Sequence, residues 1–155
     1  MCRCARKRWH YYQWQRLCQH YTRDRLLMDT LEQAQAEGRA PWTDVVLDTT
    51  QYVVYNDGYP VTPGHTLIVP KVNDKNGILN CFEFAIVMGN MNVEAEDNDI
   101  TGYNIGLNSG ESAGQTCMYP HVHLIFRRDG DTEDPRGGIR HIIPCKGNYM
   151  KQKKD

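Results

Sequence analysis

Long uninterrupted runs of apolar residues are missing from this sequence. The last apolar stretch, residues 139–144, is broken by Arg140 and His141. A membrane-spanning helix needs about 18 or more consecutive apolar residues, so we expect no such helix. The basic N-terminus lacks the apolar segment of a secretory signal, and the 13 glycines follow no collagen-like repeat. These absences exclude the membrane-spanning and collagen-like classes.

Signs of secretion are also missing, which decides how the cysteines are interpreted. The six cysteines are Cys2, Cys4, Cys18, Cys81, Cys117 and Cys145. An even number permits a disulfide framework in a small secreted protein, but nothing here indicates export. We therefore expect reduced thiols and a cytoplasmic location.

Length and composition indicate one globular domain with an appendage. The chain has 155 residues, of which 40% are hydrophobic and 24% charged, as in ordinary folded domains. Its net charge is -1, yet residues 1–25 contain seven basic side chains and only one acidic side chain. We expect a basic, helical extension over residues 1–40, a folded domain over residues 41–150 and a basic tail over residues 151–155.

The hydrophobic pattern predicts strands, a helix and further strands. Apolar residues at helical spacing predict a first helix over residues 22–36, and a second helix is expected over residues 80–96. The residues expected on the inner face of the second helix are Phe82, Ile86 and Val93. Strands are expected at residues 45–47, 52–55, 66–69, 102–108 and 119–126. This order indicates an α+β domain with a mainly antiparallel sheet.

The pair His121 and His123 is the main chemical signal. Alternate residues of a strand share a face, so Tyr119, His121 and His123 are expected on one side, while Val122 and Leu124 point into the core. Two imidazoles on one face can serve one site that binds a metal or a phosphate. The alternative is that the pair is structural or a chance occurrence.

The preceding loop favours an anion over a metal. Gly110 and Gly114 allow the backbone to approach a ligand closely, and successive N–H groups in such a turn can bind an anion. Thr116 adds a hydroxyl group and Asn108 an amide. These donors and two imidazoles suit a phosphate, whereas a metal site would need carboxylate or thiolate ligands here.

Four ordered motifs give the sequence a family resemblance. They are DGYPVTPGHTLIVPK at residues 57–71, NSGESAGQT at 108–116, HVHLI at 121–125 and GDTEDPRGG at 130–138. Over residues 45–149 the chain resembles the histidine triad (HIT) family of nucleotide hydrolases and transferases, in particular its bacterial and phage branch, which is diadenosine tetraphosphate hydrolase-like. The resemblance implies a five-stranded, mainly antiparallel sheet with one main helix, and a homodimer.

The resemblance also implies a catalytic pair. The family pattern is His-x-His-x-His with the middle histidine as nucleophile, which corresponds to His121. Tyr119 then stands in place of the first histidine, and His123 is the third. Nε2 of His121 would attack the α-phosphorus of a nucleotide to form a nucleotidyl-histidine, and water would then release the nucleoside monophosphate.

Other positions would bind the nucleotide. Asp57 would accept hydrogen bonds from the ribose hydroxyls, although it also fits a plain turn residue before Gly58. The groups expected to stabilise phosphoryl charge together with His123 are Asn108 and the loop residues Gly114, Gln115 and Thr116. His65 matches the family's histidine in the Gly-His turn and is expected near the same site.

Two departures from the family pattern bear on cofactors. Zinc-binding members use a Cys-x-x-Cys pair, a histidine that closes a Pro-Lys-x-His turn and the first histidine of the triad. Here Asn73 and Tyr119 replace the two histidines, and the pair Cys2 and Cys4 has the wrong spacing. We expect no structural zinc and no required cofactor.

The substrate stays open at this point. Transferase relatives carry glutamine in place of the third histidine, so His123 favours a hydrolase that acts on a nucleoside phosphoramidate or dinucleoside polyphosphate. The alternatives are a nucleotidyl transferase or phosphorylase of the same superfamily and a catalytically weakened protein that binds nucleotides or nucleic acid.

The basic front end allows several interpretations. Basic and aromatic side chains within residues 1–25 can bind single-stranded nucleic acid. Its cysteines and histidines do not match a known metal-ligand spacing. The remaining interpretations are a loosely attached extension and translated noncoding sequence upstream of Met28.

Overall fold

A computed structural model describes residues 28–151. The residues expected to bind nucleic acid, and Cys2, Cys4 and Cys18, lie outside this described part. Five strands form one sheet in the order β1-β2-β3-β5-β4, with every neighbouring pair antiparallel. The strands are β1 (Val45–Asp48), β2 (Tyr52–Asn56), β3 (Thr66–Pro70), β4 (Gly102–Leu107) and β5 (Val122–Arg127). The five-stranded antiparallel sheet confirms the expected architecture, and the strand at residues 119–126 begins later than expected, at Val122.

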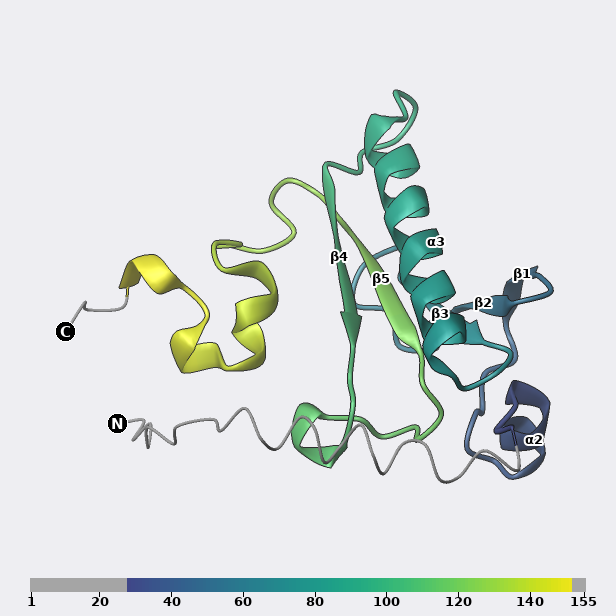
Figure 1. Ribbon diagram of the computed structural model, residues 1–155. Coiled ribbons are helices and arrows are strands. Elements are labelled where there is room, and N and C mark those ends of the chain that lie inside the picture. The colour runs from purple at the N-terminus through teal and green to yellow at the C-terminus, as the bar shows by residue number, and fades with distance from the viewer. Residues whose placement is uncertain (1–27, 152–155) are drawn as a thin grey trace.

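The main helix, α3 (Lys75–Glu94), covers one face of this sheet (Figure 1). It begins five residues before the expected start, because Asp74 caps it by accepting a hydrogen bond from the backbone N–H of Gly77 at 2.7 Å. Val122 and Leu124 of β5 point toward this helix and are buried, as the alternation predicted.

The expected inner face of α3 is only partly correct. Phe82 packs against the core, but Ile86 and Val93 are exposed. The residues that α3 buries are instead Gly77, Cys81, Ala85 and Gly89. Small residues allow the helix to lie close to the sheet, and Gly89 faces the ring of Tyr103 on β4. The buried face of α3 is therefore formed by its small residues and not by its most hydrophobic ones.

The opposite face of the sheet carries a short helix, α2 (Leu31–Ala36). Residues 28–30 are not helical, so within the described residues the helix expected over 22–36 begins only at Leu31, after the N-cap Thr30. Leu31 and Ala34 pack on Tyr55 and Tyr119 in a second hydrophobic cluster. This face also carries the histidines.

A polar cluster holds α2 to the sheet. Asp29 accepts hydrogen bonds from Arg39 and from Asn73, both at 2.8 Å. The guanidinium of Arg39 also lies 6.0 Å from the ring centre of Tyr119. The pKa of Asp29 is lowered, because the hydrogen bonds from Arg39 and Asn73 outweigh the opposing effect of burial.

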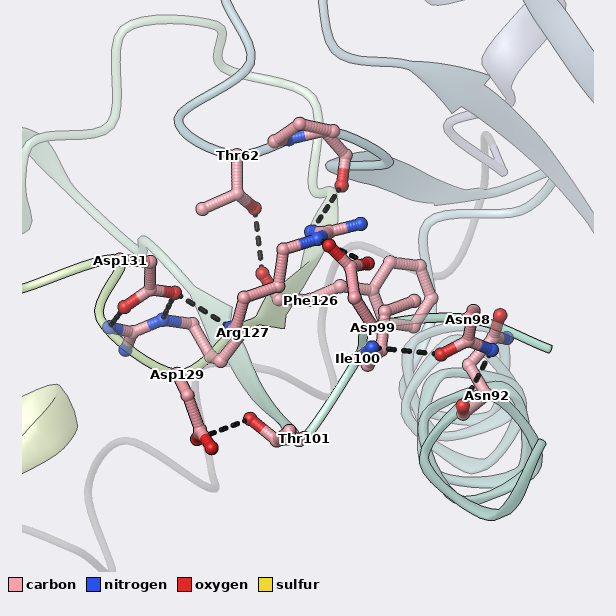
Figure 2. A network of polar contacts seen from close by, with 12 residues as sticks. Thr62, Asn92, Asn98, Asp99, Ile100, Thr101, Phe126, Arg127, Asp129 and Asp131 are labelled. Atoms are coloured by element: carbon pink, nitrogen blue, oxygen red, sulfur yellow. Dashed lines mark hydrogen bonds and ion pairs between the residues drawn. The ribbon is translucent and has the colours of Figure 1, made fainter. Parts of the chain in front are cut away.

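Figure 2 shows a network of polar contacts at the C-terminal end of β5. The hydroxyl of Thr62 donates to the carbonyl oxygen of Phe126 at 2.8 Å. Arg128 pairs with Asp99 at 2.7 Å and donates to the carbonyl oxygen of Pro63 at 3.1 Å. These bonds attach the loop between β2 and β3 to the end of β5, although about 65 residues separate them in sequence.

Short 3-10 turns follow β4 and β5. They are η1 (Glu111–Ala113), η2 (Gly138–Ile142), η3 (Pro144–Lys146) and η4 (Tyr149–Lys151). Ile139 in η2 comes within 3.8 Å of a Cβ built at Gly106 on β4, so this segment lies against the sheet edge. Among the described residues, no helix is both long and apolar enough to cross a membrane.

Candidate active site

His121 stands immediately before β5 and is 8% exposed. Its Nδ1 lies 2.9 Å from the carbonyl oxygen of Tyr119. A carbonyl oxygen can only accept a hydrogen bond, so Nδ1 carries the proton and Nε2 keeps its lone pair in the neutral ring. The backbone thus fixes the tautomer in which Nε2 is the nucleophilic nitrogen.

His65 and His123 form a second pair on the same face of the sheet. Nε2 of His65 lies 3.0 Å from Nδ1 of His123. The backbone N–H of Val61 donates to Nδ1 of His65 at 3.4 Å, which leaves the proton of a neutral His65 on Nε2. His65 therefore donates to Nδ1 of His123, and a neutral His123 carries its own proton on Nε2.

Nε2 of His123 is buried and has no hydrogen-bond partner within residues 28–151. Buried polar groups nearly always have a partner, so an orphaned donor indicates a place for a ligand acceptor. The ring of His123 lies 5.1 Å from that of His121, edge to face. The ring that carries the free N–H therefore lies next to the ring of His121.

Burial keeps both members of the second pair uncharged. Burial and the neighbouring rings of His121 and His65 lower the pKa of His123 to about 4, against a weaker opposing effect of Asp57. Burial also lowers the pKa of His65, and Asp57 opposes that shift. At neutral pH both rings are neutral, as the hydrogen-bond pattern requires.

Asp57 is a turn residue, as one of its two interpretations expected, and its contact with a ribose stays a prediction. Its Oδ1 accepts the backbone N–H of Tyr59 at 2.7 Å, as a turn residue does. Its Oδ2 lies 3.5 Å from Nε2 of His65 and 3.9 Å from Nδ1 of His123. One carboxylate oxygen therefore shapes the loop while the other faces the two histidines.

The glycine loop has the expected backbone, but the side chain of Gln115, which was expected to bind phosphate, forms hydrogen bonds within the loop. Gly110 and Gly114 have φ of +87° and +82°, which other residues rarely adopt. The side chain of Gln115 accepts from the N–H of Gly110 at 2.8 Å and donates to the carbonyl of Cys117 at 3.0 Å. Gln115 thus shapes the loop.

Asn108 and Thr116 flank this loop, Asn108 half-buried and Thr116 exposed. The hydrogen bonds between described residues join neither of them to His121 or His123. Their expected contact with a phosphate stays a prediction.

Trp42 is a site residue that sequence reasoning missed. Its ring lies 4.7 Å from that of His121 and 6.2 Å from that of Tyr55. A cavity of roughly 620 Å³ opens beside it, lined also by Leu31, Val53 and Lys71. No motif marks a lone tryptophan ahead of a strand, so only the fold reveals that Trp42 lies beside His121.

The positions of the family's structural zinc site do not fit a zinc ion. Asn73 donates its amide N–H to Asp29. The hydroxyl of Tyr119 donates to the carbonyl oxygen of Pro70, and burial raises its pKa well above the ordinary value. A neutral phenol and an amide N–H donor are not the thiolate and imidazole ligands of such sites.

Residues 42–130 match the family model described as "HIT domain". The nitrilase and fragile histidine triad fusion protein NitFhit of Caenorhabditis elegans is 27% identical over 99 residues, which are 61% of this chain and 22% of that protein. Adenylylsulfatase HINT3 of Arabidopsis thaliana is 28% identical over 82 residues, covering 48% of this chain and 41% of that protein. The chain therefore spans less than half the length of either relative.

Solved structures agree with the sequence comparison. The zinc-bound histidine triad family protein of Mycobacterium smegmatis superposes with a TM-score of 0.55 at 25% identity, and the match covers 68% of this chain and 80% of that one. The family model covers more than half of the chain, and both His121 and His123 lie within the matched residues. The chain is a member of the histidine triad family.

Proposed function

We propose that this protein is a nucleotide hydrolase that cleaves at the α-phosphate of a nucleoside phosphoramidate or dinucleoside polyphosphate through His121. The observation that carries the proposal is the 2.9 Å hydrogen bond from Nδ1 of His121 to the carbonyl of Tyr119, which leaves Nε2 with a free lone pair. The name of the Arabidopsis relative, adenylylsulfatase, supports an adenylyl-type substrate.

The reaction would take two steps at one phosphorus atom. Nε2 of His121 forms a bond to the α-phosphorus, the bond from phosphorus to the leaving group breaks, and the leaving group departs with the electron pair. Water then attacks the same phosphorus, and its proton passes through solvent to the leaving group set free in the first step. The phosphorus–nitrogen bond breaks, its electron pair returns to Nε2, and nucleoside monophosphate leaves. The proton stays on Nδ1, hydrogen-bonded to the carbonyl oxygen of Tyr119, in both steps. The ring therefore returns to the same neutral tautomer.

Neighbouring groups would stabilise the charge that develops. The unpartnered Nε2–H of His123 supplies a hydrogen bond to a phosphoryl oxygen, which a buried site makes more effective. Oδ2 of Asp57, which faces the two histidines, would accept from a ribose hydroxyl. The cavity beside Trp42 and Tyr55 offers aromatic walls for a nucleobase.

The chemistry needs no metal in this proposal. Nucleophile, hydrogen-bond donor and ribose acceptor are all side chains of this chain, and Asn73 and Tyr119 do not fit structural zinc. We also propose a homodimer, because β1 and β4 are the two edges of the sheet and Val45, Val46 and Leu47 on β1 are exposed. A reducing, cytoplasmic location is proposed with it.

The test is release of AMP from adenosine 5′-phosphoramidate and from diadenosine tetraphosphate, with and without EDTA. The variants are His121→Ala and, as a matched control, His141→Ala, whose imidazole lies in η2 and bonds to the carbonyl of Arg136. We expect release that EDTA leaves unchanged, that His121→Ala abolishes and that His141→Ala retains.

Other outcomes would select the alternatives. Exchange of labelled nucleotide without net hydrolysis would indicate a transferase or phosphorylase. Tight nucleotide binding with no turnover in the unaltered protein would indicate a binding protein. Full activity in His121→Ala would overturn the mechanism.

A further inference from the structure

Three potential metal ligands meet in one small triangle on the histidine face of the sheet. They are Oδ2 of Asp57, Nε2 of His65 and Nδ1 of His123. The atom pairs are separated by 3.0 Å between the two histidines, 3.5 Å between Asp57 and His65 and 3.9 Å between Asp57 and His123. The three side chains come from the residue just after β2, the residue just before β3 and the second residue of β5.

The triangle has the size of one face of a tetrahedral zinc site. Zinc lies about 2.0–2.2 Å from imidazole nitrogen and carboxylate oxygen, so two ligand atoms of a tetrahedral ion are about 3.3 Å apart. The observed separations of 3.0–3.9 Å bracket that value. Shifts of a few tenths of an ångström would make all three equal.

The three groups are also in a suitable chemical state. The contact of 3.0 Å between Nε2 of His65 and Nδ1 of His123 has one nitrogen as donor and the other as acceptor, so Nδ1 of His123 has a lone pair that faces the triangle. The N–H of Tyr59 holds Oδ1 of Asp57 and leaves Oδ2 to face the histidines, as hydrogen bonds to metal ligands orient them in known sites. The side chains of His65, Asp57 and His123 are 4%, 14% and 21% exposed, so one side remains open to a water molecule.

We propose that Asp57, His65 and His123 form a binding site for Zn²⁺, with water as the fourth ligand. Two imidazoles and one carboxylate are a nitrogen-rich set that favours Zn²⁺ over Mg²⁺ or Ca²⁺, which prefer oxygen ligands. The residues differ from positions 73 and 119, so this site is separate from the structural zinc site of relatives. It also goes beyond the proposed hydrolase activity, which needs no metal.

Zinc binding changes which nitrogen of His65 carries the proton. In the metal-free protein the proton on Nε2 of His65 lies inside the triangle, between His123 and Asp57. Zinc takes that position, and the proton moves to Nδ1 of His65. The long hydrogen bond of 3.4 Å from Val61 to that nitrogen is then lost. The ring stays neutral, so His65 takes up and releases no net proton.

Occupancy by zinc would oppose nucleotide binding. Oδ2 of Asp57 is the oxygen proposed to accept from ribose, and His123 is the proposed donor to the phosphoryl group. A bound ion occupies Oδ2 of Asp57, whereas its bond to Nδ1 of His123 leaves the Nε2–H of that ring free. Zinc should therefore inhibit turnover competitively with nucleotide, while a chelator restores full activity.

The experiment counts ions on the full-length protein by titration with Zn²⁺ against a chromophoric chelator, with no nucleotide present. The front segment contains other cysteines and histidines, so the comparison is between variants. Asp57→Asn and His65→Gln remove ligands of the triangle, and His141→Gln is the matched control outside it. We expect Asp57→Asn and His65→Gln each to bind one Zn²⁺ fewer than the unaltered protein, or to bind it at least tenfold more weakly, and His141→Gln to bind as the unaltered protein does.

A second measurement separates lost ligands from lost structure. In a protein labelled with ¹⁵N in its histidines, Zn²⁺ should shift the ring nitrogens of His65 and His123 and move the proton of His65 to Nδ1. Unchanged zinc stoichiometry and affinity in both ligand variants, or ring signals that do not respond to zinc, would overturn the site. Absence of nucleotide hydrolysis with these shifts present would refute the hydrolase proposal and leave the zinc site standing.

Discussion

The hydroxyl of Tyr119 donates a hydrogen bond to the carbonyl oxygen of Pro70 at 3.0 Å, deep in the core on the histidine face. The bond joins the segment before β5 to the end of β3, 49 residues away. The carbonyl of this same tyrosine orients His121. A residue that departs from the histidine triad thus anchors the backbone that orients the proposed nucleophile.

Replacement of Tyr119 by phenylalanine tests this anchor. The change removes the hydroxyl and leaves the buried carbonyl of Pro70 without its donor, which costs about 1–3 kcal/mol. We expect that loss in the free energy of unfolding measured with urea. The carbonyl of residue 119 is retained, so AMP release should fall far less than in His121→Ala. Equal loss of activity in both variants would contradict an anchoring role.

The bond from Thr62 to Phe126 provides a second test, on the loop that carries His65. Thr62→Val keeps the shape of the side chain and removes its donor, at a cost of about 0.5–1.5 kcal/mol. We expect a several-fold lower kcat/KM, because the loop that positions His65 loses one of its attachments to β5.

The matched control is Thr101→Val. Thr101 donates to Asp129 at 3.0 Å in the same network, but at the exposed start of β4 and away from that loop (Figure 2). Its kcat/KM should equal that of the unaltered protein. A similar loss in both variants would show that the whole network, and not the loop attachment, controls activity.

Close packing of α3 on β4 predicts the effect of Gly89→Ala. A Cβ at this position would lie 2.7 Å from the ring of Tyr103. Overpacking should outweigh the gain in helix propensity, so we expect a net loss of about 1–2 kcal/mol in the free energy of unfolding. Gly58→Ala is the control, since a Cβ there meets nothing within 4 Å, and its Tm should be nearly unchanged. A more stable Gly89→Ala would show that the helix shifts readily.

The ion pair of Arg127 with Asp131 predicts a pH dependence. Hydrogen bonds from Arg127 and from the N–H of Arg128 lower the pKa of Asp131 to about 2. The unfolded chain therefore binds this proton at a higher pH than the folded one, so the contribution is complete above about pH 4 and is lost as the pH falls toward 2. Asp131→Asn should lower Tm above pH 4 and have no effect near pH 2. Asp129→Asn, as the control, should leave this pH profile in place.

The positions of the strands followed from local pattern. Alternation on β5 correctly assigned Val122 and Leu124 to the helix side and His121 and His123 to the other, because side chains of a strand alternate whatever the strand pairs with. The apolar pattern alone placed the start of α3 too late. The local signal for the correct start is Asp74, which caps the helix three residues before Gly77. The inner face of α3 was mispredicted because small residues gave no hydrophobic signal.

What the sequence by itself determined is therefore where the strands lie along the chain and the face of β5 on which its histidines lie, since both depend on near neighbours in the chain. The family motifs added the identity of His121 as the candidate nucleophile. Only the tertiary structure decided that His65 bonds to His123 across 58 residues, that Asp57 completes a triangle with them and that Trp42 lies against His121. Those contacts arise from the pairing of β3 with β5, strands that are not consecutive, and from the packing of α2 and its following loop on one face. No local pattern encodes such distances, because they are set by the sheet as a whole.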